Sequence, residues 1–141
     1  MQIYIGSDHG GFNLKTKIID HLTAINLEFT DLGCYDTNSV DYPDIAKKVA
    51  DNVQNNSNAL GILVCGTGIG MSMAANKFKG IRAALISDAF SATMAKQHNN
   101  ANIICFGERV IGEQLALYCL DAFLNATFEE RHQARLNKLD Q

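Results

Sequence analysis

The residues best suited to chemistry in this sequence lie in one short stretch, from Cys65 to Met71. Glycine occupies alternate positions, 66, 68 and 70, directly after the apolar run 62–64. An apolar run, a glycine loop and a helix-forming segment predict a strand, a turn and a helix, an arrangement that exposes backbone N–H groups to an anion. Cys65 stands at the entrance of the loop, and Thr67 adds a hydroxyl group within it. Because a thiolate is favoured near a helix N-terminus, Cys65 could act as a nucleophile or as a base.

The spacing of the loop excludes the two common nucleotide-binding fingerprints. A dinucleotide-binding loop requires glycine at position 71, which is Met71 here. A Walker A loop requires a lysine before Ser72, and none is present. The loop is therefore predicted to hold a small anion or an oxyanion. A tight strand-to-helix turn, with Cys65 as a small buried residue, remains the alternative at this stage.

Other polar residues are predicted to lie near the ends of strands. Asp8 and His9 share a glycine-rich turn after the first apolar segment, and Asp88 is a plausible helix N-cap. His98 precedes another apolar segment, within the sequence KQHNNAN. Each histidine alone could be merely solvated, but a shared place on the rim of a sheet favours a site.

Three arginines are candidate ligands of an anion. Arg131 and Arg135 are four residues apart in a predicted final helix, so they would lie on one face, where like charges cost a few tenths of a kcal/mol. A shared anion would offset that cost, and arginine binds phosphate through a bidentate fork. Two solvated arginines are the alternative. Arg109 is the third candidate cation.

Hydrophobic periodicity predicts strands that alternate with helices. This alternation favours an α/β fold, a three-layer α/β/α Rossmann-like sandwich around a five-stranded parallel sheet, with ligands outside the carboxyl ends of the strands. The predicted strands are 2–6, 27–32, 62–64, 81–86 and 102–106, and the predicted helices are 12–25, 44–54, 71–77, 89–97, 110–125 and 128–139.

Length and composition limit the class of protein. The 141 residues predict a single domain, 1–141, and the net charge of −3 argues against a nucleic-acid-binding surface. The sequence has no run of 18 apolar residues, so no membrane span is predicted, and the N-terminus does not resemble a signal peptide. The four cysteines form no CxxC pair, so zinc ligation is not expected and reduced thiols in a cytoplasm fit best.

The predicted helix 110–125 indicates self-association. Its segment LALYCLDAFL is apolar nearly all round, whereas a helix that covers one sheet face should keep a polar stripe. A second copy of the chain is the simplest partner for the extra apolar face. The alternative is that this helix is wedged under the last helix.

Together these residues resemble the ribose-5-phosphate isomerase B family, which is related to the galactose-6-phosphate isomerase subunits. The resemblance covers nearly the whole chain. It rests on IGSDHGGF at 5–12, VDYPDIA at 40–46, CGTGIGMSMAANKFKGIRAAL at 65–85, QHNNANIICFGERVIG at 97–112 and FEERHQAR at 128–135.

The resemblance implies an aldose–ketose isomerase of the pentose phosphate pathway that interconverts ribose 5-phosphate and ribulose 5-phosphate through an enediolate, without metal or cofactor. It implies that Cys65 is the base and that Asp8 and His98 assist ring opening. Thr67 would lie beside the enediolate oxygens, which the backbone N–H groups of Gly66, Gly68, Ile69 and Gly70 would bind. Tyr42 and Asn99 would line the sugar, and His9, Arg109, Arg131 and Arg135 would hold the phosphate. It further implies strand order 2-1-3-5-4 and a homodimer, possibly a tetramer, whose tail, about 128–140, packs on a partner subunit.

Two departures from the family pattern bear on the substrate. Relatives that use a loop glutamate as base would place it where this chain has Met71, so this chain resembles the cysteine branch. Glu129 and Glu130 stand where many relatives have glycines, which adds acidic charge next to the tail arginines. Allose 6-phosphate and galactose 6-phosphate remain alternative substrates, the latter disfavoured by the intact Cys-Gly-Thr loop.

Two other classes of function also remain open from the sequence. A cysteine-nucleophile hydrolase or phosphatase is one, although a phosphatase loop would end in an arginine and positions 66–72 contain none. A non-catalytic phosphosugar-binding protein with the same residues is the other.

Overall fold

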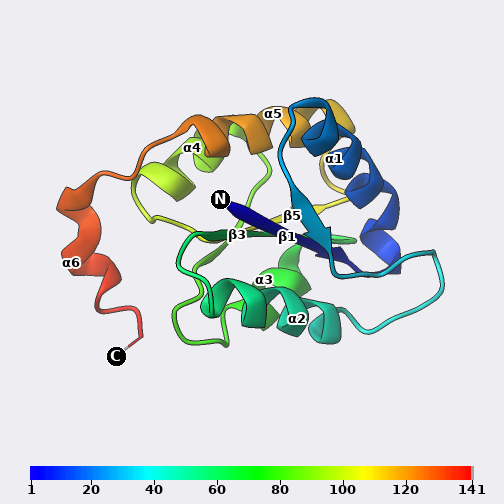
Figure 1. Ribbon diagram of the computed structural model, residues 1–141, viewed down its shortest axis with the longest axis horizontal. Helices are drawn as coiled ribbons and strands as arrows, with labels where there is room; N and C mark the ends of the chain where they lie inside the picture. Colours follow the sequence, from blue (N-terminus) through cyan, green and yellow to red (C-terminus); the bar gives the residue numbers. More distant parts are fainter. Residues whose placement is uncertain (141) are drawn as a thin grey trace.

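The computed structural model describes residues 1–140 and shows a parallel sheet between two layers of helices (Figure 1). The five strands lie in the order β2-β1-β3-β5-β4, with every neighbouring pair parallel. The α/β class and the strand order are therefore confirmed. The strands are β1 Gln2–Ser7, β2 Phe29–Asp31, β3 Ala59–Cys65, β4 Ala83–Leu85 and β5 Ile103–Gly107. The helices are η1 His9–Gly11, α1 Phe12–Ala24, α2 Tyr42–Gln54, α3 Ile69–Ala75, α4 Ala89–Gln97, α5 Glu113–Asn125, η2 Glu130–His132 and α6 Gln133–Leu136.

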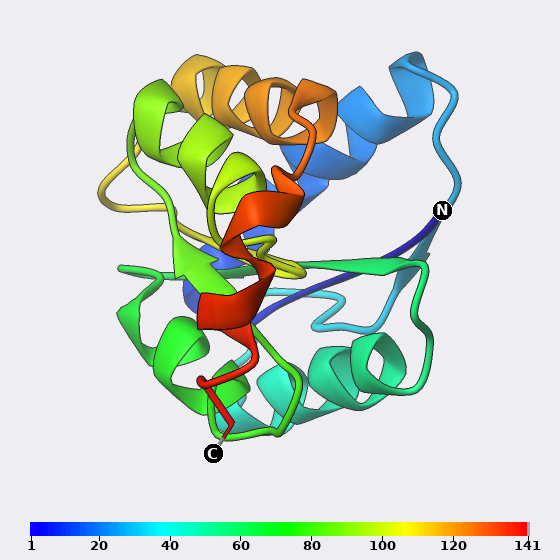
Figure 2. The same cartoon turned by 90° about the vertical axis from the view of Figure 1, so that its left-hand side faces the viewer.

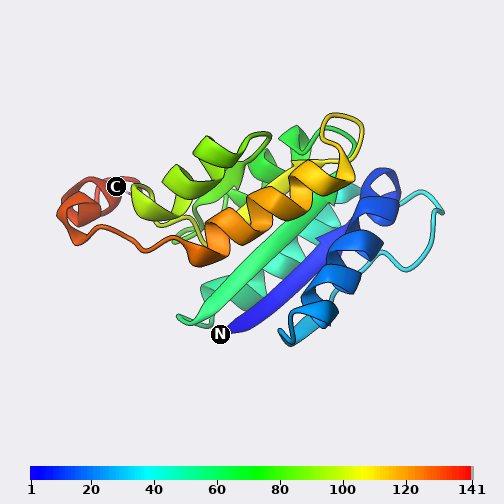
Figure 3. The same cartoon turned by 90° about the horizontal axis from the view of Figure 1, so that it is seen from above.

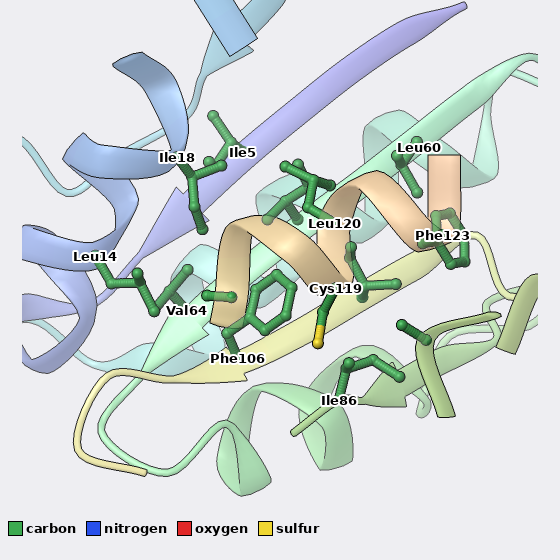
Figure 4. Close-up of a cluster of buried hydrophobic side chains, with 14 of the residues drawn as sticks. Ile5, Leu14, Ile18, Leu60, Val64, Ile86, Phe106, Cys119, Leu120 and Phe123 are labelled. Atoms are coloured by element: carbon green, nitrogen blue, oxygen red, sulfur yellow. The ribbon is translucent and has the colours of Figure 1, made fainter. Parts of the chain in front are cut away.

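The two faces of the sheet carry separate cores, because the central strands are apolar on both sides. Helices α1, α4 and α5 cover one face, and α2 and α3 cover the other (Figures 1 and 3). In β3, Ile62 and Val64 face the first core and Leu63 and Cys65 face the second, as the two-residue period of a strand requires. Figure 4 shows Phe106 of β5 within the first core, packed between helices and strands.

Strand registers determine which residues meet at the carboxyl edge of the sheet. Ser7 pairs with Val64, and Cys65 pairs with Gly107, so β1, β3 and β5 end side by side. The turn after β1 lies directly against β3, since a Cβ atom at Gly11 would be 2.5 Å from the backbone carbonyl carbon of Val64. Only glycine permits this approach, and the first turn is therefore held close to Cys65.

Helix α5 has both a buried and an exposed apolar face. Ala116, Cys119, Leu120 and Phe123 are buried against the sheet, whereas Tyr118 is 66% exposed. Leu115 is also exposed, so the apolar outer surface predicted for this helix is present. No helix within residues 1–140 has the length and apolar character that crossing a membrane requires.

The prediction of one continuous helix over 128–139 is wrong. The tail contains the 3₁₀ turn η2, the four-residue helix α6 and further turns, and it runs past the edge of the sheet from the α4–α5 layer (Figure 2). Residues 110–112 precede α5, which begins at Glu113, and β2 and β4 are shorter than predicted. These edge strands are short because only one side of each pairs with another strand, so fewer residues are held in the sheet.

Candidate active site

Cys65 lies at the end of β3 and is nearly buried, with 5% of its surface exposed. The backbone N–H of Gly68 donates to its sulfur at 3.2 Å. Gly68 has φ 77°, in the left-handed region, which turns the chain from the loop into α3. The loop therefore folds back on the sulfur, and one backbone donor is already directed at it.

The loop has fewer free N–H groups than the sequence predicts. The N–H of Gly68 is used by the Cys65 sulfur, and the N–H of Ile69 donates to the Thr67 hydroxyl oxygen at 3.3 Å. Within residues 1–140, the N–H groups of Gly66, Thr67 and Gly70 donate to no protein acceptor. The open donors are therefore these three, whereas the N–H groups of Gly68 and Ile69 already have acceptors within the loop.

Asp8 and His9 are positioned by the turn that follows β1. Asp8 caps η1, because its Oδ1 accepts the N–H of Gly11 at 3.2 Å, and its backbone N–H donates to Val64 in β3 at 3.2 Å. The backbone N–H of Val40 donates to Nδ1 of His9 at 3.2 Å. Since Nδ1 accepts this hydrogen bond, neutral His9 carries its proton on Nε2, where it can serve as a donor.

Tyr42 and Arg109 close the sides of the same loop. The Tyr42 ring lies so close to Gly70 that a Cβ atom there would be 2.7 Å from the ring. The guanidinium of Arg109 lies beside Gly66, 3.3 Å from the position of such a Cβ, and its backbone N–H donates to the Gly66 carbonyl at 3.0 Å. A phenol ring and a cation therefore flank the open N–H groups.

Two of the other thiols, those of Cys105 and Cys119, are disfavoured as thiolates. Cys105 is fully buried, and burial raises its pKa far above the ordinary range, with the nearby Cys65 sulfur raising it further. Burial also raises the pKa of Cys119. Both remain protonated thiols at neutral pH, which leaves Cys65 as the thiol at the loop.

A second cluster forms where the tail meets the end of α4. The backbone N–H of Glu129 donates to Gln97 at 2.9 Å, which brings η2 beside His98. The rings of His98 and His132 have their centroids 4.7 Å apart. Arg131 donates from Nε to Glu129 at 2.7 Å, and Arg135 donates from Nη1 to Nδ1 of His132 at 3.2 Å. Arg131 and Arg135 thus belong to one cluster, although not to one α-helix.

The tail cluster has the donor types of a metal site, but its hydrogen bonds oppose one. Ligand atoms of His98, Glu129 and His132 lie within 4.8 Å of one another. However, Nδ1 of His132 accepts from the Arg135 guanidinium, so the proton of the neutral ring is on Nε2. Nε2 is buried and has no hydrogen-bond partner within the described residues. Nε2 is therefore an N–H donor, 4.0 Å from the Glu129 carboxylate oxygen, and a protonated nitrogen cannot ligate a cation.

Within one chain the two clusters lie at opposite ends of the parallel strands, the Cys65 loop at the carboxyl ends and the tail cluster at the amino ends. Cys65 is beside the end of β5, at Gly107, whereas His98 precedes the start of β5, at Ile103. Four residues of strand separate these edges by roughly 13 Å. In Figure 1 the tail lies beyond α4 on the side from which β1 starts, opposite its arrowhead. The expectation that His98 shares the rim with His9 and Asp8 of the same chain is wrong, because α4 runs back along the sheet.

Two residues of the tail cluster were missed from the sequence, whereas Asp88 has the role predicted for it. His132 and Glu129 were not predicted as site residues, although the spacing in Arg131-His132-x-x-Arg135 offered a signal. Asp88 does act as the N-cap of α4, accepting from Ser91 N–H at 2.7 Å and from its hydroxyl at 2.8 Å. These hydrogen bonds lower the pKa of Asp88 and commit it to the helix.

The fold and the loop define a class, an α/β protein with an anion site of backbone donors beside a thiol. The model of the Ribose/Galactose Isomerase family matches residues 3–139, and the chain belongs to this family. Among curated relatives, the ribose-5-phosphate isomerase B of Escherichia coli is 45% identical over 98% of this chain and 93% of its own. That of Listeria innocua is 46% identical over 100% of this chain and 96% of its own.

Solved structures agree with this assignment. The ribose-5-phosphate isomerase B of Clostridium thermocellum superposes with a TM-score of 0.96 at 48% identity, over 99% of this chain and 95% of that one. The Mycoplasma genitalium enzyme, solved with bound ribulose 5-phosphate, gives a TM-score of 0.93 at 45% identity over 98% of this chain and 93% of that one.

Proposed function

We propose that this chain is an aldose–ketose isomerase that interconverts ribose 5-phosphate and ribulose 5-phosphate. The observation that carries the proposal is the Cys65 sulfur beside the open N–H groups of Gly66, Thr67 and Gly70. Family membership and the ribulose 5-phosphate in the Mycoplasma genitalium relative support the substrate. The reaction needs one group to move a proton on carbon and donors to stabilise an oxyanion, and the loop supplies both.

The proton transfers follow from this arrangement. In the open-chain aldose, the Cys65 thiolate takes the proton from C2, and the C1 and C2 oxygens share the negative charge of the enediolate. The open N–H groups, with the Thr67 hydroxyl, stabilise this charge; removing one such donor typically costs about 2.7–4 kcal/mol. The thiol then returns the proton to C1, while the proton of the C2 hydroxyl moves to the C1 oxygen. No electron acceptor is consumed, because oxidation at C2 balances reduction at C1.

Ring opening and phosphate binding are assigned to the remaining residues. The furanose must lose the proton of its C1 hydroxyl and gain one on the ring oxygen, and Asp8 and His98 are proposed for these transfers. Arg131 and Arg135 carry the charges that a phosphate dianion requires, with His9 and Arg109 as donors on the loop side. Asn99, next to His98, is proposed to bind a sugar hydroxyl, as is Tyr42.

The separation of the two clusters supports a homodimer with composite sites. One chain cannot bring His98 to its own Cys65 without crossing the sheet, whereas a two-fold dimer can place the tail of each chain against the loop of the other. Exposed apolar side chains beside the loop offer a surface for such contact. They are Ile69 and Met73 of α3, Leu85 of β4 and Phe90 of α4. The exposed Leu115 and Tyr118 of α5 would then serve a second contact in a tetramer.

Four free cysteines support the proposal of a reducing compartment such as the cytoplasm. They are buried, unpaired thiols, and secreted domains of this size generally pair such residues. Fractionation of cells that express the tagged protein would test this placement, and recovery from an extracellular or periplasmic fraction would contradict it.

The activity is tested by following ribose 5-phosphate by ¹H NMR in deuterium oxide. We expect ribulose 5-phosphate to form and deuterium to enter at C1, since the proton on the base can exchange with solvent during the lifetime of the enediolate. Allose 6-phosphate and galactose 6-phosphate, assayed in parallel, should react more slowly. Binding of ribose 5-phosphate without any turnover would instead indicate a phosphosugar-binding protein, and release of inorganic phosphate would indicate a hydrolase. A monomeric mass by light scattering at micromolar concentration would refute the composite site.

A further inference from the structure

The turn that carries His98 and Asn99 has a strained conformation at its next residue. Asn100 has φ 43°, in the left-handed region that side chains adopt at some cost. Its backbone N–H donates to the carbonyl of Lys96 at 3.1 Å, and the N–H of Ala101 donates to Ala95 at 2.8 Å. The end of α4 therefore turns sharply at Asn100, and the direction of this turn sets where the two preceding side chains point.

Two cations hold Asn100 from separate elements. Lys96 donates from Nζ to its side-chain Oδ1 at 2.9 Å, and Arg82 donates from Nε to its backbone carbonyl at 2.9 Å. Arg82 is itself fixed next to the start of β4, because its N–H donates to Oδ1 of Asn102 at 2.7 Å and its Nη1 to the Gly80 carbonyl at 3.3 Å. The turn is thereby tied to the edge of the sheet and to the preceding helix at once.

This arrangement is costly for the two cations. Burial lowers the pKa of Arg82, and burial together with the charge of Arg82 lowers the pKa of Lys96. Within residues 1–140, no carboxylate lies within 4.0 Å of either charged group. Both cations donate to the neutral Asn100, so its two acceptor atoms are held by charge-assisted hydrogen bonds, which are stronger than neutral ones.

We propose that Lys96 and Arg82 are positioning residues for ring opening, which fix Asn100 and thereby orient His98 and Asn99 toward the substrate. The proposal rests on the proposed function, in that His98 is taken to act on the furanose ring. It adds that the orientation of His98 is set by hydrogen bonds to a neighbouring residue, with no contact of Lys96 or Arg82 with the sugar.

The experiment isolates ring opening from isomerisation. In the Cys65→Ala background, where the enediolate cannot form, catalysed exchange between the α and β furanose anomers of ribose 5-phosphate is measured by NMR exchange spectroscopy. We expect Lys96→Met to slow this exchange by about tenfold to a hundredfold, the order that a displacement of about 1 Å produces. Lys96→Arg should restore most of the rate, since it keeps a cationic donor.

Two further variants separate positioning from general destabilisation. Lys79→Met is the matched control, because Lys79 lines the same cavity of about 520 Å³ as Lys96 and Arg82 but makes no hydrogen bond to the turn within the described residues. It should leave the exchange rate unchanged. Asn100→Gly retains access to positive φ while removing the acceptor of Lys96, so it should reproduce the loss even where Lys96→Met folds poorly.

A double-mutant cycle decides between the outcomes. If Lys96 acts through His98, then His98→Asn with Lys96→Met exchanges anomers no more slowly than His98→Asn alone. Additive losses, or unchanged exchange in both Lys96→Met and Asn100→Gly, overturn the positioning role. If His98→Asn leaves the rate of anomer exchange unchanged, the proposed role of His98 in ring opening is wrong, and the positioning role that rests on it is wrong as well. If His98→Asn slows the exchange but Lys96→Met does not, only the positioning role is wrong.

Discussion

The Cys65 loop and the tail cluster bind charge by different means. The loop is built from backbone held against backbone, with Gly68 in the left-handed region and Gly11 in contact with Val64. The tail cluster is built from charged side chains on short helical turns, and Arg131 and Arg135 are exposed. Neutral N–H donors held in a fixed backbone suit charge that develops during the reaction, whereas charged side chains suit the permanent charge of a phosphate. Under the proposed function, the chemical step and the binding step therefore depend on parts of the chain that are built in different ways.

The largest effect should come from the loop. Cys65→Ala removes the proposed base, and no carboxylate stands in the loop to replace it, so turnover should fall by about 10²–10⁴-fold. Binding of ribose 5-phosphate should persist, because the phosphate ligands are untouched. Deuterium exchange at C1 and C2 measures the proton transfer directly. Cys105→Ala is the control for a neighbouring buried thiol, and near-normal exchange in Cys65→Ala would show that another group is the base.

The tail cluster should affect binding rather than chemistry. Arg135→Ala removes a cation and leaves His132 without its partner at Nδ1. The binding free energy of ribose 5-phosphate should weaken by about 1.5–3 kcal/mol, so its Michaelis constant should rise roughly tenfold to a hundredfold. Steady-state kinetics with inorganic phosphate as competitor measure this loss. Lys138→Ala, an exposed cation on the same tail, should change little. A fall in turnover with an unchanged Michaelis constant would place Arg135 in the chemical step.

Mixing the two variants tests whether the two parts come from different chains. A hybrid of Cys65→Ala and Arg135→Ala subunits contains one site with both residues intact, so random exchange should recover about a quarter of the parent activity. Native mass spectrometry confirms the exchange. No recovery despite confirmed hybrids would mean that base and clamp belong to one chain.

A smaller, structural effect is expected where the loop backbone is held. Gly11→Ala places a methyl group 2.5 Å from the Val64 carbonyl, and such overpacking typically costs 1–3 kcal/mol, here about 2 kcal/mol. Because Val64 precedes Cys65, turnover should fall as well. Urea unfolding measures the first quantity. Gly112→Ala, where no atom lies within 4 Å, is the matched control, and equal stability of both variants would show that the contact is not tight.

The smallest effect concerns acid stability at the tail. Burial, and then the charges of Arg131 and His98, lower the pKa of His132. The unfolded chain therefore binds a proton that the folded chain does not, so the free energy of unfolding falls as the pH drops below about 6.5. His132→Asn should flatten this decline relative to the parent in thermal melts between about pH 7.5 and pH 5. A steeper decline in the variant would reverse the assigned sign.

Periodicity was sufficient to locate the strands and the loop, because both depend on local pattern, whereas the order of the strands came from the family resemblance. The apolar run before Cys65 and the alternating glycines specify a buried strand and a turn in any context. The tail was mispredicted because charged residues at helical spacing were read as one helix, whereas Glu129 pairs with Arg131 and anchors to Gln97. The partners of His132 depend on long-range packing that no spacing encodes.

The position of His98 was the more instructive error. It follows a helix rather than a strand, and in a parallel sheet the helix returns the chain to the starting edge. The topology alone therefore places His98 away from Cys65. The polar residues around His98 suggested a site at the rim, although the order of helix and strand excludes that position within one chain. The same reasoning correctly places Asp8, which directly follows a strand.

The close fit of the loop backbone also limits how this enzyme could be altered. A Cβ atom at Gly107 would lie 2.4 Å from the Thr67 backbone, and one at Gly68 would lie 2.9 Å from that of Phe106, so neither position tolerates a side chain. Ile69 and Tyr42, in contrast, border the same loop and are exposed. Substitutions that change the preferred sugar, in nature or in a library, are therefore expected at exposed residues around the loop, whereas the loop backbone itself must stay unchanged.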